Sequence, residues 1–178
     1  MAEDFKSLLG ELLQDTYSAE TQLLEALPEM AGAASTPSLR KAFEEHLAVT
    51  QRQVERLEKV AEMIGCDPDG EDCEAMEGLI AEAEEIMDEH DEGPVRDAAL
   101  IAAAQKVEHY EIAAYGTLTA MAKACGMKEA AALLAETLKE EKDTDEALTE
   151  LAEKEVNPAA LRGQAANDPT ARGKGSAA

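Results

Sequence analysis

Four segments of the chain carry apolar residues at alternating spacings of four and three, and each of these seams turns polar near its middle. The polar positions are Glu20, His46, Thr50, Gln53, Glu108, Glu111, Glu141 and Asp145. Five are carboxylates and one is a histidine. Burying such charges without partners costs roughly several kcal/mol for each ion. A pair of divalent metal ions would neutralise them, so the pattern predicts a dinuclear metal carboxylate protein.

The ligand types favour particular metals. Hard oxygen donors with one imidazole suit iron or manganese. Two divalent ions bring four positive charges, which nearly balance five carboxylates. The predicted metal ligands are therefore Glu20, His46, Glu108, Glu111, Glu141 and Asp145. One carboxylate would bridge the ions, leaving positions for water, dioxygen or peroxide.

Three further side chains are expected next to the ligands. Thr50 and Gln53 are predicted to be weak ligands, or to hydrogen-bond each other or the ligands. Tyr115 is predicted to pack in the core with a hydrogen-bonded hydroxyl, and a metal-proximal phenol is the alternative. His109 lies one residue off its seam, which indicates a surface or inter-subunit position. Glu140 is expected to face solvent. For the whole set, the alternative is a polar network without metal.

Four long helices must position these side chains. Their seams cover residues 9–27, 39–64, 101–125 and 131–152. Thr36-Pro37 is typical of a helix start, and Gly65 and Gly126 are typical of helix ends. Short links join the helices within each pair, whereas about 28 residues, Cys66 to Gly93, separate the pairs. An amphipathic stretch in this connection, Cys73 to His90, predicts an extra helix.

These features predict an all-α fold. The arrangement is a ferritin-like antiparallel four-helix bundle with one long crossover containing an extra helix. Residues 1–156 are predicted to form this domain. From about Asn157 the periodicity is lost and Gly, Pro and Ala accumulate, so residues 157–178 are predicted to be a flexible C-terminal tail.

The composition excludes several classes of partner. The chain has 39 acidic and 16 basic residues among 178, a net charge of −23, which argues against nucleic acid and anionic membranes. The N-terminal sequence has no secretory signal, and the longest apolar run, Ala98 to Ala104, is too short to span a bilayer. Three cysteines without metal-site spacing indicate reduced thiols in a cytoplasmic protein, ranked above a Cys66–Cys73 disulfide.

Four motifs carry a family resemblance. They are Tyr17–Leu23, Phe43–Leu57, Val107–Gly116 and Leu138–Asp145, spread over about residues 4–155. With these motifs the chain resembles the YciE/YciF family of ferritin-like bacterial stress proteins. The resemblance implies iron bound in the bundle and ferroxidase-like activity in a stress response. The general di-iron pattern has two Glu-x-x-His motifs, but Phe43 and Thr144 stand where this chain would need glutamate and histidine, so the site is histidine-poor.

The predicted function is oxidation of Fe(II) by dioxygen or peroxide, with two iron ions per chain and manganese as the alternative metal. Two other functions stay open: a non-catalytic helical stress protein that binds metal or a partner, and a manganese catalase or peroxidase. The apolar face of the helix at 73–90 also predicts a homodimer, unless the crossover lies flat on the bundle.

Overall fold

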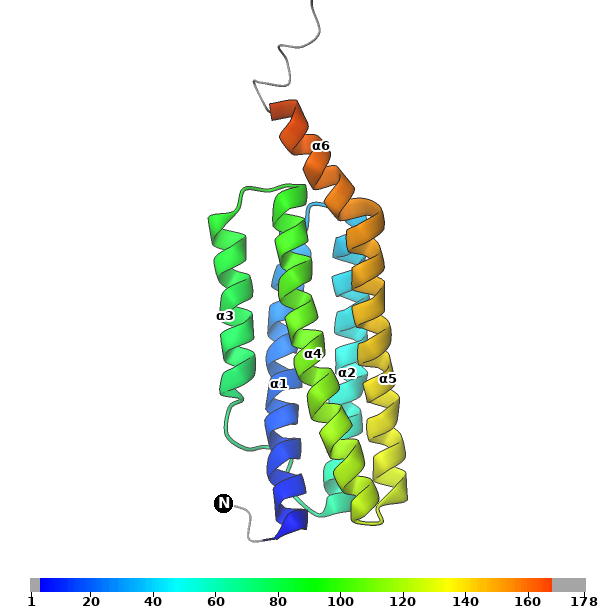
Figure 1. Ribbon diagram of the computed structural model, residues 1–178. Coiled ribbons are helices and arrows are strands. Elements are labelled where there is room, and N and C mark those ends of the chain that lie inside the picture. Colours follow the sequence, from blue (N-terminus) through cyan, green and yellow to red (C-terminus); the bar gives the residue numbers. More distant parts are fainter. Residues whose placement is uncertain (1–3, 168–178) are drawn as a thin grey trace, which may run out of the picture.

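The computed structural model describes residues 4–167, which form helices joined by short turns and loops (Figure 1). The elements are α1 (Phe5–Ala33), α2 (Pro37–Ile64), α3 (Glu74–Glu89), α4 (Pro94–Ala124), α5 (Lys128–Leu151), a π-helical turn (Ala152–Val156) and α6 (Asn157–Asn167). Within this described range there is no strand, and the all-α prediction is confirmed.

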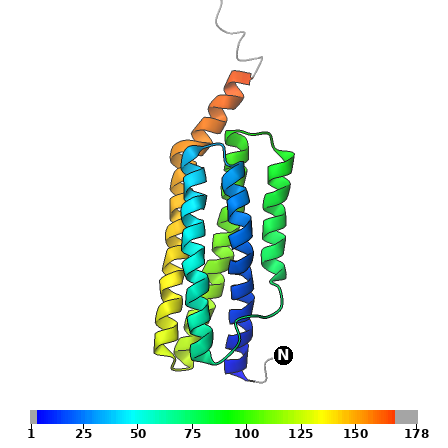
Figure 2. The same cartoon turned by 180° about the vertical axis from the view of Figure 1, so that it is seen from behind.

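The helices form two antiparallel hairpins, α1 with α2 and α4 with α5, packed into a four-helix bundle. Figures 1 and 2 show that α3 carries the chain back along the length of the bundle, so that α2 and α4 run in the same direction. This is the one-crossover connection expected of a ferritin-like bundle. In the described part of the chain, no helix combines the length and apolar character that a membrane span requires.

Helix ends follow the sequence signals, with one difference. Gly65 and Gly126 adopt φ values of 80° and 74°, the left-handed conformation that ends a helix at little cost in glycine. Thr36 precedes α2 as expected, but its hydroxyl does not cap that helix. It donates instead to Asp97, whose carboxylate also accepts from the backbone N–H groups of Ser35 at 2.8 Å and Thr36 at 2.7 Å. Asp97 therefore fastens the α1–α2 turn to the start of α4.

The core consists of two apolar clusters, one toward each end of the bundle. One contains Leu23, Leu27, Phe43, Leu100, Ile101 and Leu148 among others. The second contains Leu9, Leu13, Leu57, Val60, Leu118 and Leu134 among others. In each bundle helix, the polar residues of the seam lie between residues of the first apolar cluster and residues of the second. The predicted ligands thus lie in a layer between two apolar regions, and all of them except Asp145 are buried there.

The crossover helix α3 lies alongside α1 and α4 (Figures 1 and 2). Met76 and Ala83 are buried, and Leu79, Ile80, Ile86 and Met87 are partly buried against the cluster that contains Leu23. The apolar face of α3 is thus covered within one chain. The homodimer stays a prediction, but an unpartnered face of α3 no longer supports it.

The tail predicted from Asn157 begins as a helix, because α6 continues the chain to Asn167, while the domain boundary itself stays a prediction. Within the π-helical turn, Asn157 N–H donates to Ala152 O, and Pro158 follows in the first turn of α6, where a missing N–H is tolerated. The periodicity is lost here because α6 extends beyond the bundle (Figure 1), with Leu161 67% exposed. Residues 168–178 of the predicted tail lie outside the described range.

Candidate metal centre

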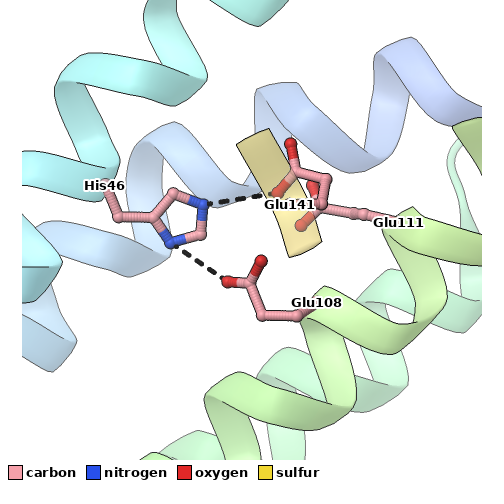
Figure 3. A group of neighbouring side chains, drawn as sticks. All are labelled: His46, Glu108, Glu111 and Glu141. Carbon is pink, nitrogen blue, oxygen red and sulfur yellow. Dashed lines mark ion pairs between the residues drawn. The ribbon is translucent and has the colours of Figure 1, made fainter. Parts of the chain in front are cut away.

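Four of the six predicted ligands come together inside the bundle. His46 comes from α2, Glu108 and Glu111 from α4, and Glu141 from α5 (Figure 3). One ligand atom from each lies within 4.8 Å of the others. His46 Nδ1 is 3.3 Å from Glu108 Oε1, and His46 Nε2 is 3.9 Å from Glu141 Oε2. Glu108 and Glu111 share a helix face because they are three residues apart.

Glu20, the predicted ligand on α1, borders this group. It is fully buried, and one of its oxygens, Oε1, accepts a hydrogen bond of 2.5 Å from the Tyr115 hydroxyl. Its charge also raises the pKa of Glu108 and of Glu111, which reflects its closeness to both. Glu20 therefore brings a fourth carboxylate to the site.

Asp145 is placed differently from the other predicted ligands. Its side chain is 25% exposed and lies at the edge of the layer. Its Oδ1 accepts from Gln105 at 3.0 Å, and its Oδ2 is 3.5 Å from His109 Nε2. The His109 side chain is 70% exposed, which agrees with its predicted surface position. Asp145 contributes negative charge beside Glu108 but does not join the group of four.

Of the three residues predicted to lie next to the ligands, two form hydrogen bonds to glutamates of the site and one does not. Gln53 is fully buried, and its amide donates to Glu141 Oε1 and, at 3.2 Å, to Glu140 Oε2. Tyr115 donates to Glu20, so the predicted hydrogen bonds of both residues are confirmed. Within residues 4–167, the buried Thr50 hydroxyl has no hydrogen-bond partner, and the bond predicted for it is absent.

A charged link beside the site is not among the features that the sequence predicts. The sequence predicts that Glu140 faces solvent, but its side chain is only 27% exposed and lies 2.8 Å from Arg56 Nη1. Arg56 also pairs with Glu136 at 3.0 Å, and its charge opposes the rise in the pKa values of Glu20 and Glu141. The sequence does contain an indication that Arg56 lies near the site: it follows Gln53 by three residues, on the same helix face.

Burial and mutual repulsion set the protonation states of the cluster. Burial raises the pKa values of Glu20, Glu108 and Glu111 well above the usual range, and neighbouring carboxylates raise them further. Burial also raises the pKa of Glu141 to about 7. It lowers the pKa of His46 to about 4, so this imidazole is neutral near pH 7. Near pH 7 and without metal, these shifts favour the protonated forms of Glu20, Glu108 and Glu111 and the neutral form of His46.

Many ligand atoms of the cluster lack hydrogen bonds. Among the described residues, the buried atoms without a partner include Glu20 Oε2, His46 Nε2, both carboxylate oxygens of Glu108 and of Glu111, and Glu141 Oε2. Buried polar atoms are normally hydrogen-bonded, and a group of exceptions calls for a ligand, an ion or water. Carboxylate oxygens and a neutral imidazole are suitable donors for iron or manganese. The residues present therefore fit a metal centre.

The cysteines lie outside this centre. Cys66, Cys73 and Cys125 are free thiols, as the sequence predicts. Burial raises the pKa of Cys73, and its sulfur lies 3.0 Å from the Tyr110 hydroxyl. None of the three belongs to the group of possible metal ligands found among the described residues.

Comparison with known proteins gives consistent matches over most of the chain. Residues 4–161 match the family described as Domain of unknown function (DUF892). Protein YciF of Escherichia coli K12 is 54% identical over 147 residues, which are 82% of this chain and 89% of YciF.

Solved structures show the same fold. The crystal structure of the E. coli stress protein YciF superposes with a TM-score of 0.84 at 50% identity, covering 88% of this chain and 99% of that one. YcfI of Rhodopseudomonas palustris gives 0.80 at 42% identity, covering 83% and 94%. A protein of Xanthomonas campestris gives 0.74 at 23% identity, covering 90% and 99%, and this match shows the fold alone.

Proposed function

The chain belongs to the DUF892 family and is a helical protein of the YciF stress-protein type, and on that premise we propose that it is a di-iron carboxylate protein that oxidises Fe(II). Its substrates would be Fe(II) and dioxygen or peroxide. The observation that carries the proposal is the cluster of four fully buried glutamates around one histidine, most of whose ligand atoms lack hydrogen bonds within the described structure.

The donor set supports binding of two divalent ions. Glu20, Glu108, Glu111 and Glu141 supply four negative charges once deprotonated, which balance two divalent cations. The neutral His46 can offer a nitrogen lone pair without losing a proton. Because the pKa values of the glutamates are raised, metal binding must displace protons from them.

The redox step balances with the substrates named. Each Fe(II) gives up one electron, and two of them reduce one dioxygen molecule, with two protons, to hydrogen peroxide. If peroxide is the oxidant, two electrons and two protons convert it to two water molecules. The part of the protein is to hold the ions close together, exclude bulk water with its two apolar clusters, and keep the ligands oriented.

Two supporting side chains orient particular ligands. The Gln53 amide fixes Glu141 through Oε1 and leaves its Oε2 without a hydrogen bond in the described structure. The Tyr115 hydroxyl fixes Glu20 in the same way: it donates to Oε1 and leaves Oε2 without a hydrogen bond in the described structure. In both residues one oxygen is held by the protein and the other is available to an ion.

The test is a titration of metal-free protein with Fe(II) without dioxygen, followed by addition of dioxygen and measurement of its consumption. We expect about two Fe(II) per chain, matching the charge of the buried glutamates. Glu108→Ala combined with Glu141→Ala should abolish binding. A matched control, Glu44→Ala with Glu146→Ala, removes exposed glutamates from α2 and α5 and should bind as the wild type does.

The outcomes separate the proposal from its alternatives. Equal uptake by the wild type and the buried double variant would refute the site. Binding of Fe(II) without dioxygen or peroxide consumption would favour the non-catalytic metal-binding protein. Preferential retention of manganese, with breakdown of peroxide, would favour the catalase or peroxidase.

A further inference from the structure

A surface pocket between α2 and α5 leads to the buried cluster. Its volume is about 330 Å³, and its lining includes the buried Phe43 and Leu148 as well as the charged Glu45, Arg52 and Asp143. His46 also lines it. The pocket therefore reaches from solvent to a side chain of the candidate metal centre.

His46 joins this pocket to the carboxylates. Glu20, Glu108, Glu111 and Glu141 have no exposed surface, whereas His46 is 5% exposed. Its imidazole borders the pocket and also lies within 3.3 Å of Glu108 and 3.9 Å of Glu141 (Figure 3). His46 Nε2 is buried and has no hydrogen-bond partner among the described residues. Movement of this one side chain would open a direct path from the pocket to the glutamates.

A second connection runs through a hydrogen-bonded pair. Glu140 lines the pocket, and its Oε2 accepts from the Gln53 amide at 3.2 Å. The same amide nitrogen donates to Glu141 inside the cluster. A polar route made of Glu140, Gln53 and Glu141 therefore runs beside His46.

The lining is rich in carboxylates. Glu45, Glu140 and Asp143 outnumber Arg52 there, although each also pairs with a basic residue outside the lining: Lys41 at 3.0 Å, Arg56 at 2.8 Å and Lys139. The Arg52 guanidinium donates to the Ala48 carbonyl of its own helix, at 2.6 Å. Because the chain has a net charge of −23, its field raises the local concentration of cations, and these carboxylates offer oxygen atoms to them.

We propose that the pocket between α2 and α5 is the entrance through which divalent cations reach the buried glutamates, with His46 as its inner wall. The proposal deepens the function proposed above and rests on it. A pocket between α1 and α3, of about 290 Å³, provides a comparison: it is lined by Glu25, Glu29, Glu77 and Glu84, but none of the cluster residues borders it. Negative charge alone does not make that pocket an entrance.

The experiment compares two alanines, one from each pocket. Ala147 and Ala81 are both exposed on helices and line the α2–α5 and α1–α3 pockets respectively. Metal-free, full-length protein is mixed with Co(II), which absorbs visible light when bound and is not oxidised by dioxygen on this timescale. The amplitude of the absorbance change reports the number of sites, and its rate reports access to them.

Ala147→Phe should fill the α2–α5 pocket and slow Co(II) uptake by about tenfold or more, with an unchanged final amplitude. Ala81→Phe should leave the rate as in the wild type. Asp143→Lys should also slow uptake and weaken its dependence on salt, since steering by charge changes association rates by about tenfold to a thousandfold. Asp143 has a side chain 59% exposed, so this second variant does not disturb the core.

Each result decides between the proposals. Wild-type uptake rates in both Ala147→Phe and Asp143→Lys would overturn the entrance while leaving the metal centre intact. Loss of amplitude in a helical Ala147→Phe protein would also overturn it, because the substitution would then be affecting the site and not access. Absence of any Co(II) binding by the wild-type protein would instead refute the proposed function.

Discussion

Asp97 and Glu111 are both completely buried carboxylates, but their surroundings are opposite. Asp97 accepts three hydrogen bonds, two from backbone N–H groups and one from the Thr36 hydroxyl. In the described structure neither carboxylate oxygen of Glu111 has a hydrogen-bond partner, and the same holds for Glu108, whose nearest recorded contact is His46 Nδ1 at 3.3 Å. Asp97 shows how this chain satisfies a structural carboxylate. The contrast is what distinguishes the cluster from an ordinary buried polar network.

Tyr115→Phe tests how the ligands are oriented. The change removes the donor to Glu20 and leaves a buried oxygen unpaired, which should lower the free energy of unfolding by about 1–3 kcal/mol. Metal affinity should fall by about 10- to 100-fold, the usual effect of losing a partner that orients a ligand. Chemical denaturation and calorimetric titration with Mn(II) would measure the two effects.

Tyr110→Phe is the matched control. It removes a tyrosine hydroxyl that donates to Asp15 at 2.7 Å, away from the cluster. It should lower stability without changing metal affinity. An equal loss of affinity in both variants would show that the effect of Tyr115 is general and not transmitted through Glu20.

Helix α4 is buried on more than one face. It supplies Glu108 and Glu111 to the candidate metal centre on one face. Another face packs under α3, and Ala103 and Val107 are buried in the cluster that α3 covers. A helix buried on more than one side cannot show a single apolar stripe. The seam of α4 was nevertheless readable, because its two glutamates interrupt an otherwise apolar series.

Met76→Ala tests whether α3 is fastened to the bundle. Met76 is completely buried, so its truncation should lower the free energy of unfolding by about 2–5 kcal/mol, the usual cost of such a cavity. The number of Co(II) ions bound should not change, since α3 contributes no residue to the cluster. Denaturation with urea and Co(II) titration would check both. A loss below about 0.5 kcal/mol would indicate that α3 is only loosely attached.

For the whole molecule, the buried glutamates link stability to pH. In the unfolded chain a glutamate has a pKa near 4.5, whereas folding raises it to about 7 in Glu141 and well above the ordinary value in Glu20, Glu108 and Glu111. A group with a raised pKa in the folded state stabilises most below its unfolded pKa, and this contribution is lost as pH rises through the folded value. His46 acts in the opposite direction below about pH 6.5, but it is one group against four.

Metal-free protein should therefore lose stability between about pH 4.5 and 7, and it should lose more above pH 7 as the other glutamates deprotonate. Bound metal should restore it, because an ion binds the folded state in preference to the unfolded one. Melting temperatures with EDTA and with Mn(II), from pH 5 to pH 8, would measure this. Melting temperatures that do not respond to metal at pH 7.5 would contradict a buried metal centre.

Assembly remains a prediction at the scale of the molecule. The face of α3 that first suggested a homodimer is covered by α1 and α4. The candidate ligands all come from one chain, so metal binding should not depend on a dimer. Light scattering at micromolar concentration would decide: a mass near 19.0 kDa means a monomer, and about twice that mass means the expected dimer.

The sequence by itself determined the helical class, the order of the bundle helices and most of the candidate site. It could do so because an amphipathic helix displays its buried face at a fixed spacing, and a polar residue interrupting that face is visible in the sequence. Glu20, His46, Glu108, Glu111 and Glu141 were found in this way, and all five are buried.

Only the tertiary structure decided which polar residues meet. Asp145 shares the seam of Glu141 but lies at the edge of the layer, because one further turn along α5 brings it to the partly exposed side next to His109. The pairing of Glu140 with Arg56 and the role of Asp97 depend on contacts between helices distant in sequence. The burial of the apolar face of α3 depends on such contacts as well. Helix periodicity says which side of a helix is buried, and packing alone determines what lies opposite.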